Sequence, residues 1–595
     1  MWAYHTPSTL MKSFLLLFPS YLVYTMGAAP TEIAWKPYTL KYTASKGLDA
    51  SEANVAMPAI WPDTPVPSSD VTNGKSSTIS VHLRRIQLAG QKIRKVAILL
   101  EGGPGANANL YEKQIGDFFN LLGKDTLFVL YDHRGVGKSS KVMSGKDEKF
   151  RSSDVLSALP SQVPYPLPAL TTINAAFDVV AIAKLVAKEQ KEKVKLILLG
   201  SSYGTLPAML AAKLDPSFDR LILEGLVGFN RIPQQQFTAG RELIDNCTSH
   251  PKCNASLGPN PYRLFNLIPE LVKNPKRNTC SDFFSEHAKK KAGPEDKWAV
   301  SERLYTYMRL EPQKPKQGDL RLVLALLLQL ESCTDLGKTK EMINILDAEV
   351  KEDKMTAIKE VSPELNSFAL NYIYSSNVAI ESLPQYCMAA EPPALLYNRC
   401  AAAKSSLETK DFFSTYLGKH FMPADSRIAT PLVAPNLKVL ILQGDLDYVT
   451  SLAEAHEVAK RMNVKSVQLR RFRNRGHTII GGAMNKCVAK LVADAFGEGS
   501  KMAADDCLAT LNSKTLIWDE VLPFMPATGP KTPLPSYALT RDDGNLPVFA
   551  KPSFFAFLGL GDYLWWVLGG SAALLLLLII LVVFLLVRRR RQSKY

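Results

Sequence analysis

The sequence lacks the short motifs that mark metal, redox and nucleic-acid sites. None of its eight cysteines forms a Cys-x-x-Cys pair, the spacing typical of zinc and thiol redox centres. No stretch combines clustered Lys and Arg with interleaved aromatic residues. The net charge of +15 includes five cations in residues 588–595, so the rest of the chain is only mildly basic. We therefore expect no metal, no cofactor and no nucleic-acid partner.

A phosphate-binding loop is also missing, although one segment resembles it. Residues 132–139 read DHRGVGKS and end in the Gly-Lys-Ser of the motif G-x-x-x-x-G-K-[ST]. Asp132 occupies the position of the first glycine, where the backbone must turn around the phosphates. The loop is therefore not an ATP site. We expect Asp132 and Arg134 to hold it by pairing with each other or with nearby backbone.

The composition that remains is typical of a folded protein from an oxidising compartment. The 595 residues are 46% hydrophobic and 21% charged, which does not favour disorder. Nearest-neighbour pairing of the cysteines would join Cys247 with Cys253, Cys387 with Cys400, and Cys487 with Cys507, leaving Cys280 and Cys333. The sequence leaves other pairings open. Asn246 and Asn254 each begin an Asn-x-Ser/Thr glycosylation acceptor.

The two ends of the chain predict export and one membrane anchor. Lys12, an apolar run at 14–24 and small residues at 27–29 follow the order of a secretory signal peptide, assigned to 1–29. A membrane anchor is the alternative there, but the run is short and contains Pro19. Residues 564–587 carry no charge, and four arginines follow at 588–591. This order predicts a single-pass type I membrane protein whose tail is cytoplasmic and whose body is lumenal or extracellular.

Strand and helix patterns alternate on both sides of a helical block. Continuous apolar runs predict buried strands at 96–100, 127–131, 194–199, 221–223 and 438–443, with further strands at 78–83 and 466–472. Between 229 and 430 the periodicity is helical, and the apolar run 322–330 is too short to span a membrane. We expect a sheet core at 30–228 and 431–522, interrupted by a helical cap at 229–430. A proline-rich stalk at 523–562, a transmembrane helix at 563–587 and a tail at 588–595 complete the predicted organisation.

The chain is organised around residues 194–213, which read VKLILLGSSYGTLPAMLAAK. An apolar strand ends at Gly200, Ser202 stands between Gly200 and Gly204, and a helix-compatible segment follows at once. This is the Gly-x-Ser-x-Gly turn in its required context of strand, sharp turn and helix. Strand and helix can approach closely there only if the two flanking residues lack side chains. The pattern predicts Ser202 as a nucleophile; an ordinary strand-to-helix turn is the alternative.

A serine nucleophile needs a base and a carboxylate that orients the base. Of the eight histidines, only His477 follows the serine in a loop after a predicted strand. The order serine, acid, histidine places the acid after the strand 438–443, where Asp447 and Asp445 both qualify. We favour Asp447, because Asp445 stands beside Gly444 and suits a turn.

Two backbone N–H groups are expected to stabilise the oxyanion that forms during attack by Ser202. The strand 96–100 ends in a glycine-rich turn at 101–105, and Gly103 is the predicted donor because Pro104 has no N–H. The backbone N–H of Tyr203 is the predicted second donor. A plain tight turn is the alternative interpretation of 101–105.

At these residues the sequence resembles the proline iminopeptidase and tripeptidyl-aminopeptidase family of α/β-hydrolase serine peptidases. The resemblance rests on GGPG at 102–105, DHRGVGKS at 132–139, TINAAFD at 172–178, GSSYGT at 200–205, GDLDYVT at 444–450 and Gly476-His477. It covers about 96–225 and 437–492, and it implies an α/β-hydrolase fold with an inserted helical cap. It also implies release of residues from peptide N-termini by a triad of Ser202, Asp447 and His477. Glu101, Ser201 and Tyr448 depart from the family pattern, and Glu101 adds a carboxylate near the oxyanion turn.

Two other functions remain compatible with the sequence. An esterase or lipase would use the same triad and differ only in the pocket formed by the cap. A hydrolase fold on a membrane stalk could also serve in adhesion without catalysis, but such a protein has no reason to keep all three triad residues. We therefore expect a membrane-anchored serine peptidase that acts on peptide substrates.

The predicted topology can be tested by proteolysis of sealed cells or vesicles. Protease added outside should remove the body, residues 30–555, and spare the tail, because the arginines at 588–591 hold that end in the cytoplasm. Cutting within 523–552 should release a soluble, active enzyme. Immunoblotting of both fractions measures the outcome, and an active site protected on the cytoplasmic side would contradict the topology.

Overall fold

The computed structural model describes the central part of the chain. The described residues are 28–43, 47–64, 75–103, 105–140, 164–228, 235–264, 267, 270–271, 274–292, 299–308, 310, 319–360, 430–477, 479–480, 485–514 and 516–529. Within these ranges no helix combines the length and the apolar character needed to cross a bilayer. The predicted membrane span at 563–587, the tail, nearly all of the signal peptide and the pair Cys387–Cys400 lie outside the described residues.

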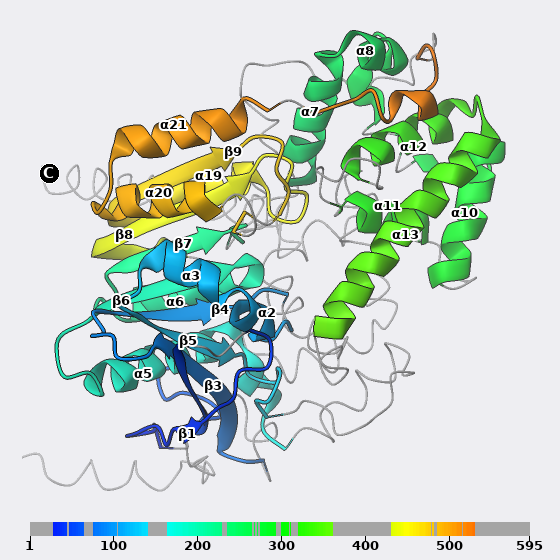
Figure 1. The fold of residues 1–595 in the computed structure, drawn as a ribbon. Coiled ribbons are helices and arrows are strands. Elements are labelled where there is room, and N and C mark those ends of the chain that lie inside the picture. Colours follow the sequence, from blue (N-terminus) through cyan, green and yellow to red (C-terminus); the bar gives the residue numbers. More distant parts are fainter. Residues whose placement is uncertain are drawn as a thin grey trace, which may run out of the picture. The chain divides into compact units, whose positions relative to one another are not determined.

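A nine-stranded sheet forms the core, in the order β1-β2-β3-β5-β4-β6-β7-β8-β9 (Figure 1). The strands are β1 (Lys36–Pro37), β2 (Leu48–Pro58), β3 (Thr78–Leu88), β4 (Lys95–Leu100), β5 (Thr126–Asp132), β6 (Lys195–Ser201), β7 (Arg220–Glu224), β8 (Val433–Gly444) and β9 (Asn463–Phe472). From β5 to β9 all pairings are parallel, whereas β1, β2 and β3 pair antiparallel. The expectation of a mostly parallel sheet is confirmed. The sequence pattern missed β1 and β2.

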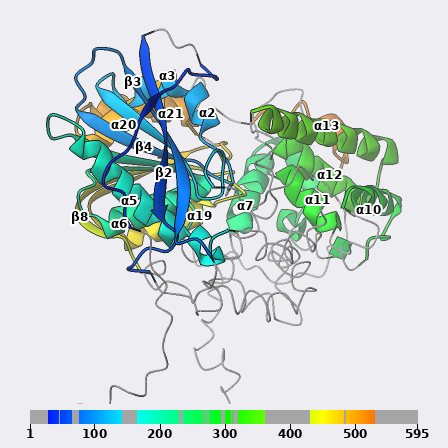
Figure 2. The same ribbon diagram turned by 90° about the horizontal axis from the view of Figure 1, so that it is seen from below.

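Helices cover both faces of this sheet, as Figures 1 and 2 show. They are α2 (Asn109–Lys113), α3 (Ile115–Leu122), α5 (Thr172–Lys188), α6 (Thr205–Leu214), α19 (Leu452–Arg461), α20 (Asn485–Phe496) and α21 (Lys501–Asn512). Along β6, Leu196 and Leu198 join the apolar cluster with α5, α6 and α19, while Ile197 and Leu199 join the one with α3, α20 and α21. Successive side chains of a strand point to opposite faces, so a continuous apolar run is buried on both.

Between β7 and β8 lies a helical insertion with an apolar core of its own. Its described helices are α7 (Gln235–Thr248), α8 (Pro251–Leu257), α10 (Thr279–Ala292), α11 (Ala299–Met308), α12 (Leu320–Ser332) and α13 (Leu336–Glu360). The apolar run 322–330 forms most of α12, which is buried along its length. Periodicity predicted helices at 235–248, 261–272, 300–308, 320–330 and 341–350, and it missed α8 and α10.

Three disulfides in the described residues match the nearest-neighbour prediction. Cys247–Cys253 joins α7 to α8, Cys280–Cys333 joins α10 to the end of α12, and Cys487–Cys507 joins α20 to α21. Each bridge therefore connects two helices of the same part of the fold. Two bridges lie in the helical insertion and one in the sheet core.

The segment after α21 returns to the helical insertion. Trp518, Val521 and Met525 are buried in its apolar cluster, and the Ser256 hydroxyl donates to the carbonyl oxygen of Pro526 at 2.6 Å. Residues 523–529, which the proline content assigned to the start of a stalk, thus pack against α8 and α12. The physical reason is that the apolar side chains of Phe524 and Met525 pack against the apolar cluster of the helical insertion, which exists only in the folded chain.

The loop at 132–139 is held mainly through backbone and through a buried ion pair. Asp132 accepts hydrogen bonds from the backbone N–H groups of Ala108 (2.9 Å) and Lys138 (3.1 Å). Arg134, fully buried, donates to both carboxylate oxygens of Asp178 on α5 at 2.6 Å. It also donates to the carbonyl oxygens of Pro58, Ala59 and Ala169. Asp132 and Arg134 were expected to pair with each other or with nearby backbone. The structure shows backbone contacts for both residues.

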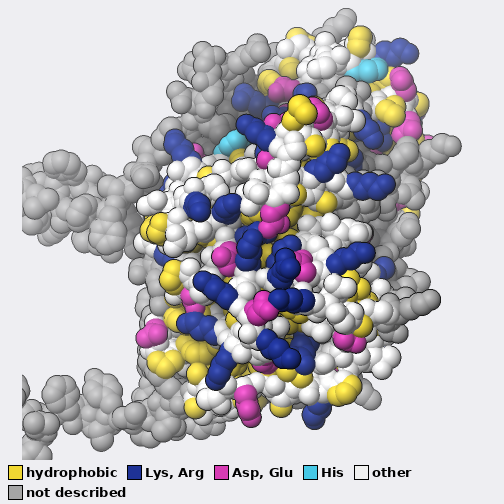
Figure 3. Space-filling model, turned by 60° about the vertical axis from the view of Figure 1, so that its left-hand side comes forward, with side chains coloured by type: hydrophobic (Ala, Val, Ile, Leu, Met, Phe, Trp, Pro, Cys, Tyr) yellow, Lys and Arg dark blue, Asp and Glu magenta, His cyan; other side chains and the backbone are white. Residues whose placement is uncertain are grey.

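Basic residues lie side by side on four adjacent strands: Lys95, Lys195 and Arg220 are the first residues of β4, β6 and β7, and Lys438 on β8 pairs with Arg220. Figure 3 shows Lys and Arg side chains gathered on that side of the molecule, with Asp and Glu among them. Glu498 forms ion pairs with Arg220, Lys195 and Lys95. The hydrogen bond from Arg220 is the main cause that lowers the pKa of Glu498 to about 2. Glu498 thus neutralises part of the positive charge of this cluster, which lies away from the carboxyl ends of the strands.

Candidate active site

Ser202 lies on a strained turn between β6 and α6. Its φ is +52°, in the left-handed region that costs energy for a residue with a side chain. A Cβ added at Gly204 would lie 2.0 Å from the carbonyl oxygen of Leu100, and one at Gly200 would lie 2.4 Å from the carbonyl oxygen of Gly204. Only glycine permits these approaches. The close contact holds the backbone of the turn, and therefore Ser202, against the end of β4.

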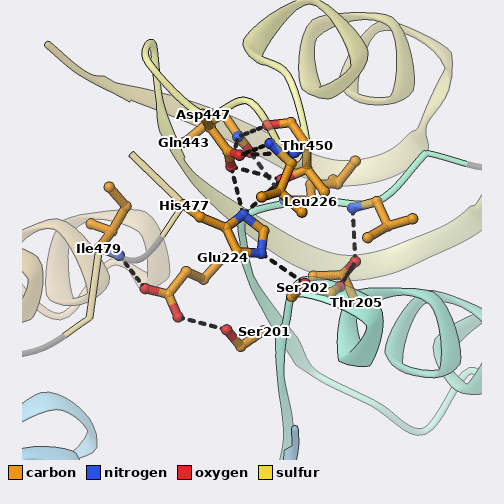
Figure 4. A network of polar contacts seen from close by, with 12 residues as sticks. Ser201, Ser202, Thr205, Glu224, Leu226, Gln443, Asp447, Thr450, His477 and Ile479 are labelled. Atoms are coloured by element: carbon orange, nitrogen blue, oxygen red, sulfur yellow. Dashed lines mark hydrogen bonds and ion pairs between the residues drawn. The ribbon is translucent and has the colours of Figure 1, made fainter. Parts of the chain in front are cut away.

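The structure brings Ser202, His477 and Asp447 together at the carboxyl ends of β6, β8 and β9 (Figure 4). His477 Nε2 lies 2.8 Å from Ser202 Oγ, and His477 Nδ1 lies 2.8 Å from Asp447 Oδ2. A carboxylate accepts but does not donate, so Nδ1 carries the proton and Nε2 is free of it. Nε2 can therefore accept the proton of the Ser202 hydroxyl.

Asp447 is fully buried and its orientation is fixed by four donors besides His477. The backbone N–H groups of Val449 and Thr450 donate to Oδ1, both at 2.8 Å. The Thr450 hydroxyl (2.7 Å) and Gln443 Nε2 (2.9 Å) donate to Oδ2. These four hydrogen bonds hold the Asp447 carboxylate in the orientation in which Oδ2 faces His477. Sequence reasoning missed Gln443 and Thr450, since neither residue type is specific to such a role.

Asp445, the other candidate acid, faces away from the histidine. Its carboxylate accepts from Arg471 Nη2 at 2.9 Å and from the backbone N–H of Asn474 at 2.7 Å. Arg471 also donates to Glu242 on α7 at 2.9 Å, so this group joins the sheet to the helical insertion. Asp445 is therefore a structural residue, and the geometry favours Asp447 as the partner of His477.

The glycine-rich turn after β4 lies against the nucleophile. A Cβ at Gly102 would lie 2.7 Å from the Cβ of Ser202, and Gly103 has a φ of +109°. His133 Nε2 donates to the carbonyl oxygen of Glu101 at 3.0 Å, which ties the turn to the loop 132–139. The backbone N–H of Gly102 donates to the side chain of Glu101 at 3.0 Å. Gly102 thus lies against Ser202, and the roles of Gly103 and Tyr203 as oxyanion donors stay predictions.

Glu224, at the end of β7, is a residue of the site that the sequence did not single out. The hydroxyl of Ser201 donates to Glu224 Oε2 at 3.0 Å, and the backbone N–H groups of Ile479 and Ile480 donate to Oε1 (Figure 4). Glu224 therefore contacts the residue before Ser202 and two residues shortly after His477. The signal that could have found it is a carboxylate directly after the buried apolar run 221–223.

Two buried carboxyl groups thus lie beside the triad, Glu101 and Glu224. Burial raises the pKa of Glu101 to about 7, and the nearby charge of Glu224 adds to the rise. Burial also raises the pKa of Glu224, against the opposing effect of the hydrogen bonds from Ile479, Ile480 and Ser201. A pKa of about 7 means that Glu101 is partly protonated near neutral pH.

The stability of the protein should reflect this buried acid. Because the folded-state pKa of Glu101 exceeds its ordinary value of 4.5, its protonation stabilises the fold below about pH 4.5 and this contribution is lost as pH rises through about 7. Relative to Glu101→Gln, the wild type should lose on the order of 3 kcal/mol of unfolding free energy between about pH 4.5 and 8. Urea unfolding of both proteins across this range measures the difference. A difference that does not change with pH would contradict the assignment.

Comparison with known proteins gives the family. The family model described as alpha/beta hydrolase fold matches residues 96–481, more than half of the chain. The comparison with curated proteins gives no match.

Among solved structures, the chain is similar to a proline iminopeptidase-related protein from Thermus thermophilus. That match has 16% identity and a TM-score of 0.27, and it covers 73% of this chain and 94% of the other. The chain is also similar to acetyl xylan esterase 1 from a Thermoanaerobacterium species at 10% identity and a TM-score of 0.31, covering 78% and 87%. A third similarity is to a peroxisomal alpha/beta-hydrolase from Saccharomyces cerevisiae at 13% identity and a TM-score of 0.33, covering 76% and 89%. By the family model, the chain belongs to the alpha/beta hydrolase fold family.

Proposed function

We propose that this protein is a serine hydrolase that works through a covalent acyl-enzyme. The observation that carries the proposal is the continuous chain from Ser202 Oγ through the His477 ring to Asp447, with both contacts at 2.8 Å. In this family-wide arrangement the serine attacks, the histidine moves the proton and the carboxylate orients the histidine. Each of the three side chains has the partner that its role requires.

The reaction would proceed in two steps, acylation of Ser202 and hydrolysis of the acyl-enzyme. Ser202 Oγ bonds to the substrate carbonyl carbon while its proton passes to His477 Nε2. The resulting tetrahedral oxyanion would be stabilised by the N–H groups of Gly103 and Tyr203. The bond to the leaving amine or alcohol then breaks, and His477 gives it the proton. A water molecule repeats the sequence on the acyl-enzyme, so the acid is released and Ser202 regains its proton.

For the substrate we propose peptides with a free N-terminus, from which the enzyme releases residues as a prolyl or tripeptidyl aminopeptidase does. The motifs at 102–105, 172–178, 200–205 and 444–450 support this choice. The helical insertion is suited to select the substrate, because Leu446 and Tyr448, which flank Asp447, belong to its apolar cluster. An acyl ester is the competing substrate class for the same triad.

For the location we propose a type I membrane protein with the catalytic domain in the lumen or outside the cell. The signal-like start, the apolar segment at 563–587 and the arginines after it support this topology. The three disulfides of the described residues fit an oxidising compartment. Of the two glycosylation acceptors, Asn254 on α8 is exposed, whereas Asn246 on α7 is half-buried and donates to the carbonyl oxygen of Glu242.

The triad can be tested with a serine-directed fluorophosphonate and matched variants. Ser202→Ala should abolish labelling and turnover, and His477→Ala should lower turnover by on the order of 10⁴, because triad members act as a unit. Asp447→Asn should cost far more activity than Asp445→Asn, since only Asp447 contacts the histidine. Near-normal hydrolysis by the Ser202 or His477 variant, with export and folding intact, would refute the proposal.

Substrate class can be tested with pairs of peptides that differ only in N-terminal acetylation. A buried ammonium needs a carboxylate partner, which we expect from Asp or Glu residues of the helical insertion. Acetylation removes this charge and should reduce kcat/KM by on the order of 10² or more. Equal cleavage of both peptides would indicate an endopeptidase, and cleavage of acyl esters alone would indicate an esterase.

A further inference from the structure

Glu224 has contacts that its place outside the triad does not explain. It is 4% exposed, and among the described residues no Lys or Arg is paired with it. Its two oxygens accept three hydrogen bonds, from the Ser201 hydroxyl and from the N–H groups of Ile479 and Ile480. A buried carboxylate without a cation is costly, and such groups cluster at functional sites.

The three donors come from the two chain segments that carry the nucleophile and the base. Ser201 immediately precedes Ser202, and Ile479 lies two residues after His477. Ser202 and His477 are 275 residues apart in the sequence, so their separation depends on tertiary contacts such as these. Glu224 connects the two segments through a single side chain.

The other side of the histidine loop is held by the loop of the acid. The backbone N–H of Leu446 donates to the carbonyl oxygen of Arg475 at 2.9 Å, and the N–H of Asn474 donates to Asp445 at 2.7 Å. His477 is thus held on its N-terminal side through 445–446 and on its C-terminal side through Glu224. Next to Glu224, a Cβ at Gly225 would lie 2.9 Å from His477 Cε1, so the imidazole packs directly against this strand end.

We propose that Glu224 is a positioning residue that fixes His477 relative to Ser202 and stabilises the imidazolium formed during catalysis. This inference rests on the proposed serine hydrolase function. Hydrogen bonds from these three donors favour the ionised form of Glu224, and it is in this form that the side chain would act on His477. Its charge lies close enough to interact with His477, and an opposite charge favours the imidazolium.

The groups around this carboxylate come from four elements. They are Glu101 after β4, Tyr111 on α2, Ser201 on β6 and His477 after β9. Tyr111 donates its hydroxyl to the carbonyl oxygen of Leu100 at 3.1 Å and lies beside both carboxyl groups. The hydrogen bonds from Ile479, Ile480 and Ser201 and the nearby His477 favour the charged form of Glu224, against the effect of burial.

The experiment measures the rate at which a fluorophosphonate labels Ser202 as a function of pH, so that no natural substrate is needed. Three variants separate the parts of the proposal. Glu224→Ala removes all three acceptors and should lower the labelling rate by roughly 10- to 100-fold through loss of alignment. Ser201→Ala removes one of the three contacts and keeps the charge, so the acid limb of its profile should stay in place.

Glu224→Gln is the variant that discriminates between positioning and mere structure. Its amide oxygen can accept from Ile479 and Ile480, and its amide N–H can face the Ser201 hydroxyl, but the charge is gone. Without the negative charge the imidazolium is less stable, so the acid limb should move to lower pH by roughly one unit. A residue that serves the fold alone would change the unfolding temperature and leave this limb unmoved.

The outcomes distinguish this inference from the proposed function. If the wild type is not labelled at Ser202, with Ser202→Ala as the blank, both fail. If it is labelled, but Glu224→Gln shows an unshifted acid limb and a wild-type rate, the role of Glu224 is refuted and the triad stands. Should Glu224→Ala fail to fold, the profiles of Glu224→Gln and Ser201→Ala still decide.

Discussion

The close approach of backbone to backbone at Gly200 and Gly204 is the constraint on which the site depends. Any side chain at Gly204 would occupy the space of the Leu100 carbonyl, and any side chain at Gly200 would meet the backbone of the turn. Because these gaps are closed, Ser202 is held at a positive φ next to the end of β4. The same contact fixes the distance between the nucleophile and the turn that carries Gly103. A fold with a looser turn would keep its serine but lose its alignment with His477.

The remaining parts of the site are supported by contacts that link segments far apart in the chain. Asp447 is oriented from within its own loop by Val449 and Thr450, and from β8 by Gln443. Leu446 and Tyr448, the apolar residues on either side of Asp447, lie in the apolar core of the helical insertion. A shift of the inserted helices would therefore act on the loop that carries the acid.

Charge in this region is arranged by burial as much as by pairing. Arg134 and Asp178 neutralise each other in the core, with backbone carbonyls taking the remaining donors of the guanidinium. Among the residues that the structure describes, no cation is paired with Glu101 or Glu224, and the two carboxyl groups differ in their hydrogen bonds. Glu224 accepts three hydrogen bonds, whereas the backbone N–H of Gly102 donates to Glu101, so the charged form of Glu224 has more support. Two glutamate side chains in the same region thus differ in how well their surroundings support the charged form.

The sequence alone determined the features that depend on local pattern. Apolar runs gave the parallel strands, the spacing Gly200-Ser202-Gly204 gave the turn, and elimination among eight histidines gave His477. Only the tertiary structure decided between Asp445 and Asp447, because both follow the same strand and differ in which partner, Arg471 or His477, lies opposite. The packing of 523–529 and the contacts of Glu224 were likewise beyond the sequence. Their partners are brought close by the order of strands in the sheet, and that order is set by packing over long separations rather than by neighbouring residues.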